Sequence, residues 1–139
     1  MTLKFFTFLF VIFSFGLHAQ NVGIKMTGTP NAVLDVNGSV AIREGTPLSI
    51  ANGTNNNVAV DSMSYYRLTA PTAAFTITGF TNGLDGRILT LINATNFTMT
   101  LKHQNVSSTA ANRINTGGAD FTIAANGVVT LYYNVTLTN

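Results

Sequence analysis

The chain has 139 residues, of which only 9% are charged, and its formal net charge at pH 7 is +2. It contains no cysteine, which excludes both a disulfide scaffold and a Cys–His catalytic pair. Its few Lys and Arg residues are scattered singly, so there is no basic patch of the kind that binds nucleic acid. A surface with so few charges repels its own copies weakly, which favours association between copies.

The first 19 residues, MTLKFFTFLFVIFSFGLHA, have the plan of a secretory signal peptide. Lys4 precedes an apolar run from Phe5 to about Phe15, and Ala19 ends the segment with a small residue. The run is short for a membrane span, although an uncleaved anchor is the alternative interpretation. We therefore expect cleavage after residues 1–19 and a secreted chain without membrane contact. Its location is then extracellular or at the cell surface, with the periplasm as the alternative.

Residues 20–70 are predicted to form an N-terminal β-arm. The arm begins with NVGIKMTGTPNAVLDVNG, in which Asn37-Gly38 separates two runs of alternating apolar residues. Because Asn-Gly suits the tight type I′ turn, this pattern predicts a hairpin over Ala32–Arg43. Further short strands are expected at 47–51, 58–62 and 64–70.

Residues 71–139 are predicted to form a compact β-domain, separated from the arm near Ala70-Pro71. Strands are expected at 74–80, 87–93 and 97–104, with a weaker one at 111–116. A second hairpin is expected over Asp120–Asn134, with Asn126-Gly127 at its tip.

Alternation within these strands predicts which side chains face the core. Phe75 and Ile77 share one face, as do Phe97, Met99 and Leu101 of a later strand. The strand over 87–93 carries apolar residues on both faces, so it is expected to be central in its sheet.

The fold class predicted from these signals is all-β. Helical periodicity is nearly missing, whereas about ten short strands recur between turn pairs. This pattern favours short antiparallel strands and hairpins that form a β-sandwich or barrel-like domain with an N-terminal β-arm. No internal repeat of fixed period is visible, which argues against a solenoid.

The sequence offers little for catalysis or metal binding. After removal of His18 with the signal peptide, His103 is the only histidine, and it is in phase with inward Met99 and Leu101. The five acidic residues each stand alone, which disfavours a carboxylate pair or a zinc site. Asp35 begins a segment similar to a calcium loop, but Thr46 stands where the bidentate Glu belongs. We predict no enzyme activity, no cofactor and no metal.

Two tyrosine pairs are candidate glycan contacts: Tyr65-Tyr66 and Tyr132-Tyr133. In each pair one ring is expected to face inward and the other outward, where it could stack on a sugar. A monomeric carbohydrate-binding module is therefore an alternative function, although the chain has no Trp. Ser62, in Asp61-Ser62-Met63, is a candidate for O-glycosylation because it matches a short pattern associated with Bacteroidetes.

Thr-x-Thr pairs raise ice binding as a remote alternative, because flat arrays of threonine can bind ice. The pairs are Thr76/Thr78, Thr98/Thr100 and Thr136/Thr138. Their spacing is irregular, and threonine on the solvent face of a strand is the ordinary explanation.

The opening phrase carries a family resemblance. NVGI at 21–24, TP at 29–30 and LDVNG at 34–38 resemble the start of secreted, fibre-like surface proteins of Bacteroidetes, and phage tail-fibre-like proteins, with the pattern NVGIGTxxPxxxLDVxG. DGRILTLINAT at 85–95 and GVVTLYYN at 127–134 look like a β-module of the same group. Lys25-Met26 departs from the pattern, since Gly-Thr is usual there.

The resemblance implies a secreted structural or adhesive module of a cell-surface or tail-fibre-like assembly. Such modules are often trimeric, and the resemblance carries over no catalytic residue. We therefore expect a homo-oligomer that associates through β-edges, with a trimer favoured. A surface glycan is the other partner to consider.

Overall fold

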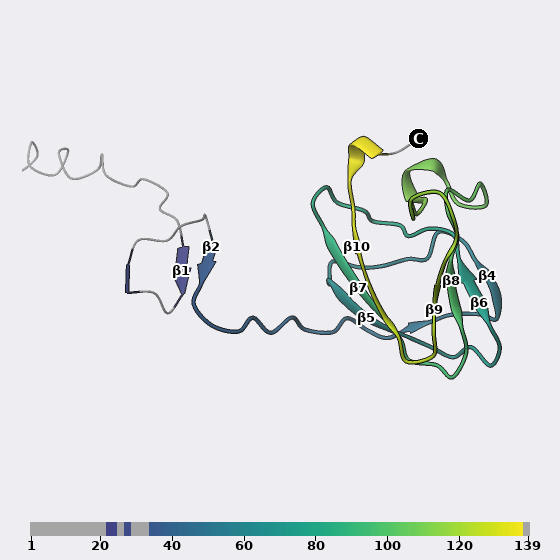
Figure 1. Cartoon of the computed structure of the whole chain (residues 1–139), viewed down its shortest axis with the longest axis horizontal. Coiled ribbons are helices and arrows are strands. Elements are labelled where there is room, and N and C mark those ends of the chain that lie inside the picture. Colours follow the sequence, from purple (N-terminus) through teal and green to yellow (C-terminus); the bar gives the residue numbers. More distant parts are fainter. Residues whose placement is uncertain (1–21, 25–26, 29–33, 138–139) are drawn as a thin grey trace, which may run out of the picture. The chain divides into compact units, whose positions relative to one another are not determined.

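The computed structural model describes residues 22–24, 27–28 and 34–137 (Figure 1). The chain divides into two units, Met1–Ala41 and Ile42–Asn139. In the first unit, β1 (Val22–Ile24) and β2 (Leu34–Val36) pair in parallel. The predicted signal peptide lies outside the described residues.

The second unit contains two four-stranded sheets. The β10 sheet has the strand order β10-β7-β5-β3, and the β9 sheet has the order β4-β6-β8-β9. In chain order the strands are β3 (Leu48–Ser49), β4 (Gly53–Asn55), β5 (Tyr65–Thr69), β6 (Phe75–Ile77), β7 (Ile88–Asn93), β8 (Met99–Leu101), β9 (Phe121–Ile123) and β10 (Val128–Tyr132).

The chain alternates between the two sheets as it advances from β3 to β8. Strands that are two apart in the chain therefore lie side by side in the same sheet and run parallel, as β5 does with β7 and β6 with β8. Parallel strands need a crossover connection, and here the strand in the opposite sheet supplies it. β9 and β10 then pair antiparallel with β8 and β7, respectively. The unit is thus a short coil of strands that ends in two reversed strands.

The spacing between stacked strands varies along this coil, in keeping with the absence of a fixed period in the sequence. Leu48 pairs with Leu68, whereas Tyr65 pairs with Thr90, so the step from one turn of the coil to the next is not constant. Because the connecting loops differ in length, the stacked strands leave no fixed period in the sequence. The predominance of parallel pairing corrects the expectation of antiparallel strands.

Neither predicted hairpin forms. β2 ends at Val36, residues 39–43 form no strand, and β2 pairs in parallel with β1. At the second site, the turn at Asn126-Gly127 connects β9 in one sheet to β10 in the other. Asn126 has φ 58°, as Asn before Gly tolerates. Asn126-Gly127 therefore forms a turn, as predicted, but the strands on either side of it pair with β8 and β7 and not with each other.

The core lies between the inner faces of the two sheets (Figure 1), and the predicted alternation largely holds. Phe75 and Ile77 are buried, as are Met99 and Leu101, whereas Phe97 is exposed. β7 lies between β10 and β5, which confirms its central position. The core cluster consists of Ile50, Val60, Tyr66, Leu68, Phe75, Ile77, Phe80, Leu89, Leu91, Met99, Leu101, Ile114 and Ile123.

The remaining elements are two short 3-10 helices, η1 (Ala110–Asn112) and η2 (Val135–Leu137). Residues 42–70, placed with the arm in the sequence interpretation, form β3, β4 and β5, which pair within the two larger sheets. Among the described residues, no helix is long and apolar enough to cross a membrane.

Candidate binding surfaces

The outer face of the β10 sheet exposes apolar side chains in adjacent strands. Tyr132 on β10 pairs with Ile88 on β7, and Val128 pairs with Ile92. Exposed fractions are 73% for Tyr132, 57% for Val128 and 43% for Ile88. Alternation produces this face, because the intervening β10 residues Val129 and Leu131 pack inward against the core. We call Ile88, Val128 and Tyr132 the outer apolar face.

β10 is also an edge strand. It pairs with β7 on one side and is the last strand in the order of its sheet, among the residues that the structure describes. Between the two strands, the Oγ1 atoms of Thr90 and Thr130 lie 3.1 Å apart, in the middle of the outer face. An exposed apolar face that continues to an unpaired edge offers both side-chain burial and backbone hydrogen bonds to a partner.

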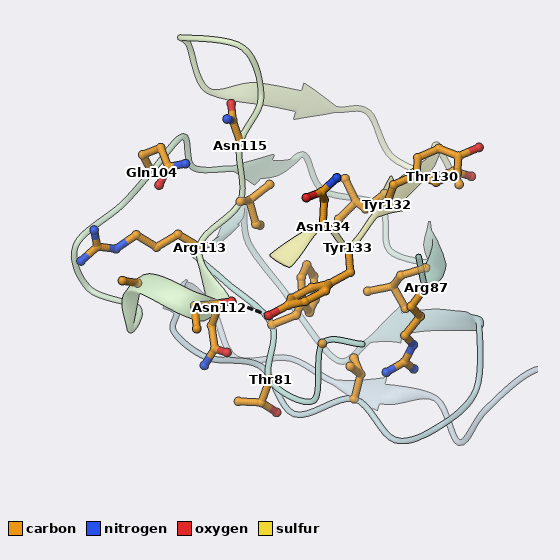
Figure 2. Close-up of a pocket in the computed structure, with 18 residues that line it drawn as sticks. Thr81, Arg87, Gln104, Asn112, Arg113, Asn115, Thr130, Tyr132, Tyr133 and Asn134 are labelled. Atoms are coloured by element: carbon orange, nitrogen blue, oxygen red, sulfur yellow. Dashed lines mark hydrogen bonds between the residues drawn. The ribbon is translucent and has the colours of Figure 1, made fainter. Parts of the chain in front are cut away.

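A cavity of about 510 Å³ opens beside the end of β10, where Thr130, Leu131 and Tyr132 are among its lining residues (Figure 2). Its size lies in the range typical of small-molecule sites. Five of its lining residues are apolar and buried or packed against the core: Val60, Phe80, Leu89, Ile114 and Leu131. Its polar lining includes the amides of Gln104, Asn112, Asn115 and Asn134.

Tyr133 crosses this cavity from the end of β10 toward η1 (Figure 2). Its hydroxyl donates a hydrogen bond of 3.1 Å to the carbonyl of Ala111. The ring lies so close to Gly83 that a Cβ there would be 1.8 Å from Tyr133 Cε2. The absence of a side chain at Gly83 therefore allows Tyr133 to hold β10 against η1.

Arg87 lies at another part of the cavity wall, at the start of β7. Its Nη1 donates to the carbonyl of Asn82 at 2.9 Å, and its Nη2 donates to the carbonyls of Asp61 and Met63. Its Nε is buried and has no hydrogen-bond partner among the described residues. Arg87 is thus a cation held by backbone oxygens, with one buried donor unused. An unpaired buried donor is uncommon and requires an explanation.

The structure separates the four tyrosines predicted as glycan contacts. Tyr66 is buried in the core, Tyr65 is half-buried on the outer face of β5, and Tyr133 is half-buried in the cavity. Tyr132 alone presents most of its ring to solvent. Ser62, the predicted O-glycosylation site, is exposed in the loop before β5.

Tyr66, on the buried face of β5, instead makes a polar contact with the loop that precedes that strand. Its hydroxyl donates to the carboxylate of Asp61, which also accepts the backbone N–H of Met63 at 2.9 Å. Two hydrogen bonds hold the pKa of the Asp61 carboxyl below its ordinary value. The bond from the Tyr66 hydroxyl has the larger effect, and the bond from the Met63 N–H has the smaller one. Burial, followed by the hydrogen bond to Asp61, raises the pKa of Tyr66.

His103 is half-buried at the end of β8, as its phase predicted. Its Nδ1 accepts the backbone N–H of Thr116 at 3.1 Å and lies 3.1 Å from the Thr116 hydroxyl. These contacts orient the ring against its own loop. No group of three or more His, Asp or Glu side chains lies together within the described part of the chain.

Threonines form a row across the outer face of the β9 sheet, where sequence spacing suggested no order. Strand register pairs Thr54 with Thr76, Thr76 with Thr100, and Thr100 with Thr122. The row repeats at the strand spacing of about 4.8 Å. Thr78 is fully buried and so does not extend it. The Thr-x-Thr pairs therefore do not form a two-row array, and Thr138 lies outside the described residues.

No family model, curated protein or solved structure matches this chain.

Sequence reasoning identified Tyr132 and Tyr133 but missed the cavity and Arg87. The cavity wall comes from segments around residues 60, 80–89, 104, 110–115 and 130–134. Only the coil brings these segments together. The one local signal was the isolated Arg87 at the start of a strand with apolar residues on both faces.

Proposed function

We propose that the chain is a secreted, non-catalytic structural or adhesive module of a fibre-like surface assembly, and that it self-associates through its β-edges. The observation that carries this proposal is the outer apolar face beside the edge strand β10. Tyr132 pairs with Ile88, Val128 pairs with Ile92 further along the same face, and Ile88, Val128 and Tyr132 are exposed. Exposed apolar side chains gathered on one face mark an interaction surface.

The energetics favour burial of this face. Fully burying a Val or Ile side chain contributes roughly 1.5–3 kcal/mol, and an aromatic ring adds comparable apolar area. Few charges oppose the contact, since the whole chain is only 9% charged. Natural edge strands are usually protected by charges, prolines or bulges. β10 has the sequence VVTLY, which contains no charge and no proline.

The resemblance of the opening phrase to fibre-like proteins favours a trimer, in which rotational symmetry closes the edges. Under this proposal the two sheets act as a sandwich-like body, and the segment before β3 acts as an N-terminal arm. The resemblance and the predicted signal peptide both support a place outside the cell.

Replacing Tyr132 with Lys tests the proposal. A lysine would place a charge at the most exposed position of the outer apolar face, so the association constant should fall about tenfold or more. Light scattering and sedimentation velocity measure this change. Val106→Lys is the matched control, because Val106 is similarly exposed but lies in the loop between β8 and η1. Equal association of both variants and the unaltered chain would refute the role of this face.

A second candidate function is carbohydrate binding, which the exposure of Tyr132 supports. Its ring stands next to the hydroxyl-bearing Thr90–Thr130 pair, so an aromatic platform and hydrogen-bonding groups occur together. A glycan array with the unaltered chain should then show saturable binding that Tyr132→Ala removes. Phe121→Ala, which removes an exposed ring from the other sheet, is the control. Binding that both variants retain would exclude Tyr132 as the platform.

A further inference from the structure

We propose that residues 39–43 of one copy add as a strand to the free edge of β10 in a second copy. This inference rests on the proposed self-association and deepens it, because it names the segment that covers the edge. Three features carry it: the direction of the backbone groups of β10, the apolar pattern of residues 39–43, and the short reach of that segment within its own chain.

The backbone of β10 directs hydrogen-bonding groups to its free edge. Just after the strand, the N–H of Tyr133 donates to the carbonyl of Arg87 at 2.9 Å. Just before it, the carbonyl of Gly127 accepts the N–H of Asn93 at 2.9 Å. Every second residue of an antiparallel strand bonds to the same neighbour, so the odd-numbered residues of β10 face β7. The residues that face the free edge are Val128, Thr130 and Tyr132.

These same residues carry the outward side chains of β10. A strand added at this edge would therefore accept and donate backbone hydrogen bonds, and its own outward side chains would extend the outer apolar face. Addition of an extended segment to an exposed sheet edge is a recurring mode of recognition, in which backbone bonds supply affinity and alternate side chains supply specificity.

Residues 39–43, SVAIR, have the pattern that this edge requires. Val40 and Ile42 are 68% and 59% exposed, and they stand two residues apart, so they share one face when the segment is extended. Branched side chains of this kind favour strands. In the described chain, however, residues 39–43 form no strand. Beside β10, Val40 and Ile42 would lose solvent contact against the outer apolar face.

The segment cannot reach β10 of its own chain. The N–H of Gly45 donates to the carbonyl of Tyr65 at 2.8 Å, which places Gly45 beside β5 on the side of β3. Glu44 pairs with Arg67 of β5 at 2.6 Å. From there the free edge of β10 lies four strand spacings of about 4.8 Å away, about 19 Å in all. The three residues from Ile42 to Gly45 span at most about 11 Å, so the added strand comes from a second copy.

The resulting contact is head-to-tail, because it joins the segment before β3 in one copy to β10 in the next. Each copy then donates one strand and receives another. Contacts between two different surfaces of the same chain close into a ring when their rotation allows it. Three copies arranged in this way would leave no free β10 edge.

Two charge variants, Ile42→Lys and Tyr132→Lys, test the contact by sedimentation velocity. Each variant alone should associate about tenfold more weakly than the unaltered chain, or less still. An equimolar mixture should form pairs, because the intact segment of the Tyr132→Lys chain can add to the intact β10 of the Ile42→Lys chain. Val106→Lys changes neither surface and should associate as the unaltered chain does.

Amide hydrogen exchange of the unaltered chain gives an independent readout. As the concentration rises through the range of association, amides within residues 39–43 and the amide of Thr130 should exchange more slowly together. The amide of Thr122, in the edge strand β9 of the other sheet, is the comparison and should keep its rate.

The outcomes separate this inference from the proposed function. An unaltered chain that associates while residues 39–43 gain no protection would overturn the strand addition and leave self-association standing. A mixture that pairs no better than either variant alone would also overturn it. An unaltered chain that stays single at the highest concentration would overturn both the strand addition and the proposed self-association.

Discussion

The hydroxyl of Tyr66 donates a hydrogen bond to the carboxylate of Asp61, and this contact joins the buried face of β5 to the loop that precedes it. The Tyr66 ring also lies over Gly45, where a Cβ would stand 2.3 Å from Cε1. The pKa of Asp61 is lowered, first by the Tyr66 hydrogen bond, and the pKa of Tyr66 is raised, first by burial. The free energy of unfolding therefore depends on the ionisation of this side-chain pair in both the acidic and the alkaline range.

The first prediction concerns this pH dependence. Because the pKa of Asp61 is lowered by folding, its contribution is present above about pH 3.9 and is lost as pH falls through the folded pKa. Because the pKa of Tyr66 is raised, its contribution is present below about pH 10 and is lost as pH rises through the folded pKa. Tyr66→Phe should therefore weaken the pH dependence of stability in both windows.

Urea midpoints measured between about pH 2 and pH 11 check this prediction. Tyr65→Phe makes the same chemical change on the opposite face of β5 and should keep the profile of the unaltered chain. Asp61→Asn should alter the acid window most. If Tyr66→Phe and Tyr65→Phe give the same profile, the Tyr66–Asp61 contact does not link folding to pH.

The second prediction concerns the fit of Gly83 to Tyr133. A Cβ at position 83 would overlap the Tyr133 ring, which the hydrogen bond to Ala111 holds in place. Gly83→Ala should therefore lower the free energy of unfolding by about 1–3 kcal/mol. In a Tyr133→Ala background the same change should cost much less, because the obstructing ring is gone. Chemical denaturation of the four chains in this double-mutant cycle measures the coupling, and strict additivity would contradict the fit.

The third prediction concerns a buried polar network between the loops. Ser108 Oγ accepts the backbone N–H of Asn57 at 2.9 Å and lies 2.7 Å from the Thr78 hydroxyl. Ser108 and Thr78 are both fully buried, so Ser108→Ala leaves the Asn57 N–H without its partner. The loss should be about 1–3 kcal/mol in the free energy of unfolding. The exposed Ser107→Ala is the control, and an equal effect from both would argue against the network.

The sequence predicted most strands of the second unit but not their partners, for a physical reason. The strands expected at 58–62 and 111–116 do not form, and β4 was not expected. Alternation reports which side chains are apolar, and this correctly placed Phe75, Ile77, Met99 and Leu101 in the core. It does not report which strand lies alongside. Asn126-Gly127 does form a turn. However, the strand that follows it, β10, pairs with β7 in the opposite sheet, and β7 is longer than β9.

The candidate sites show the same limit more strongly. Outward exposure of Tyr132 follows from alternation along β10 and was predictable. Burial of Asn93 was not, because it depends on carbonyls of Phe97 and Ala124 that accept its amide at 2.7 and 3.0 Å. The threonine row and the cavity likewise arise from register between strands more than twenty residues apart. Such features become visible only when the coil is known.

The mass of the unaltered chain in solution tests the central claim most directly. Sedimentation equilibrium of the 14.8 kDa chain over a wide concentration range should give a defined multiple of the single-chain mass, and the proposal favours three copies. Burial of the outer apolar face around Tyr132 is the physical reason. A single-copy mass that persists at the highest concentration would contradict self-association.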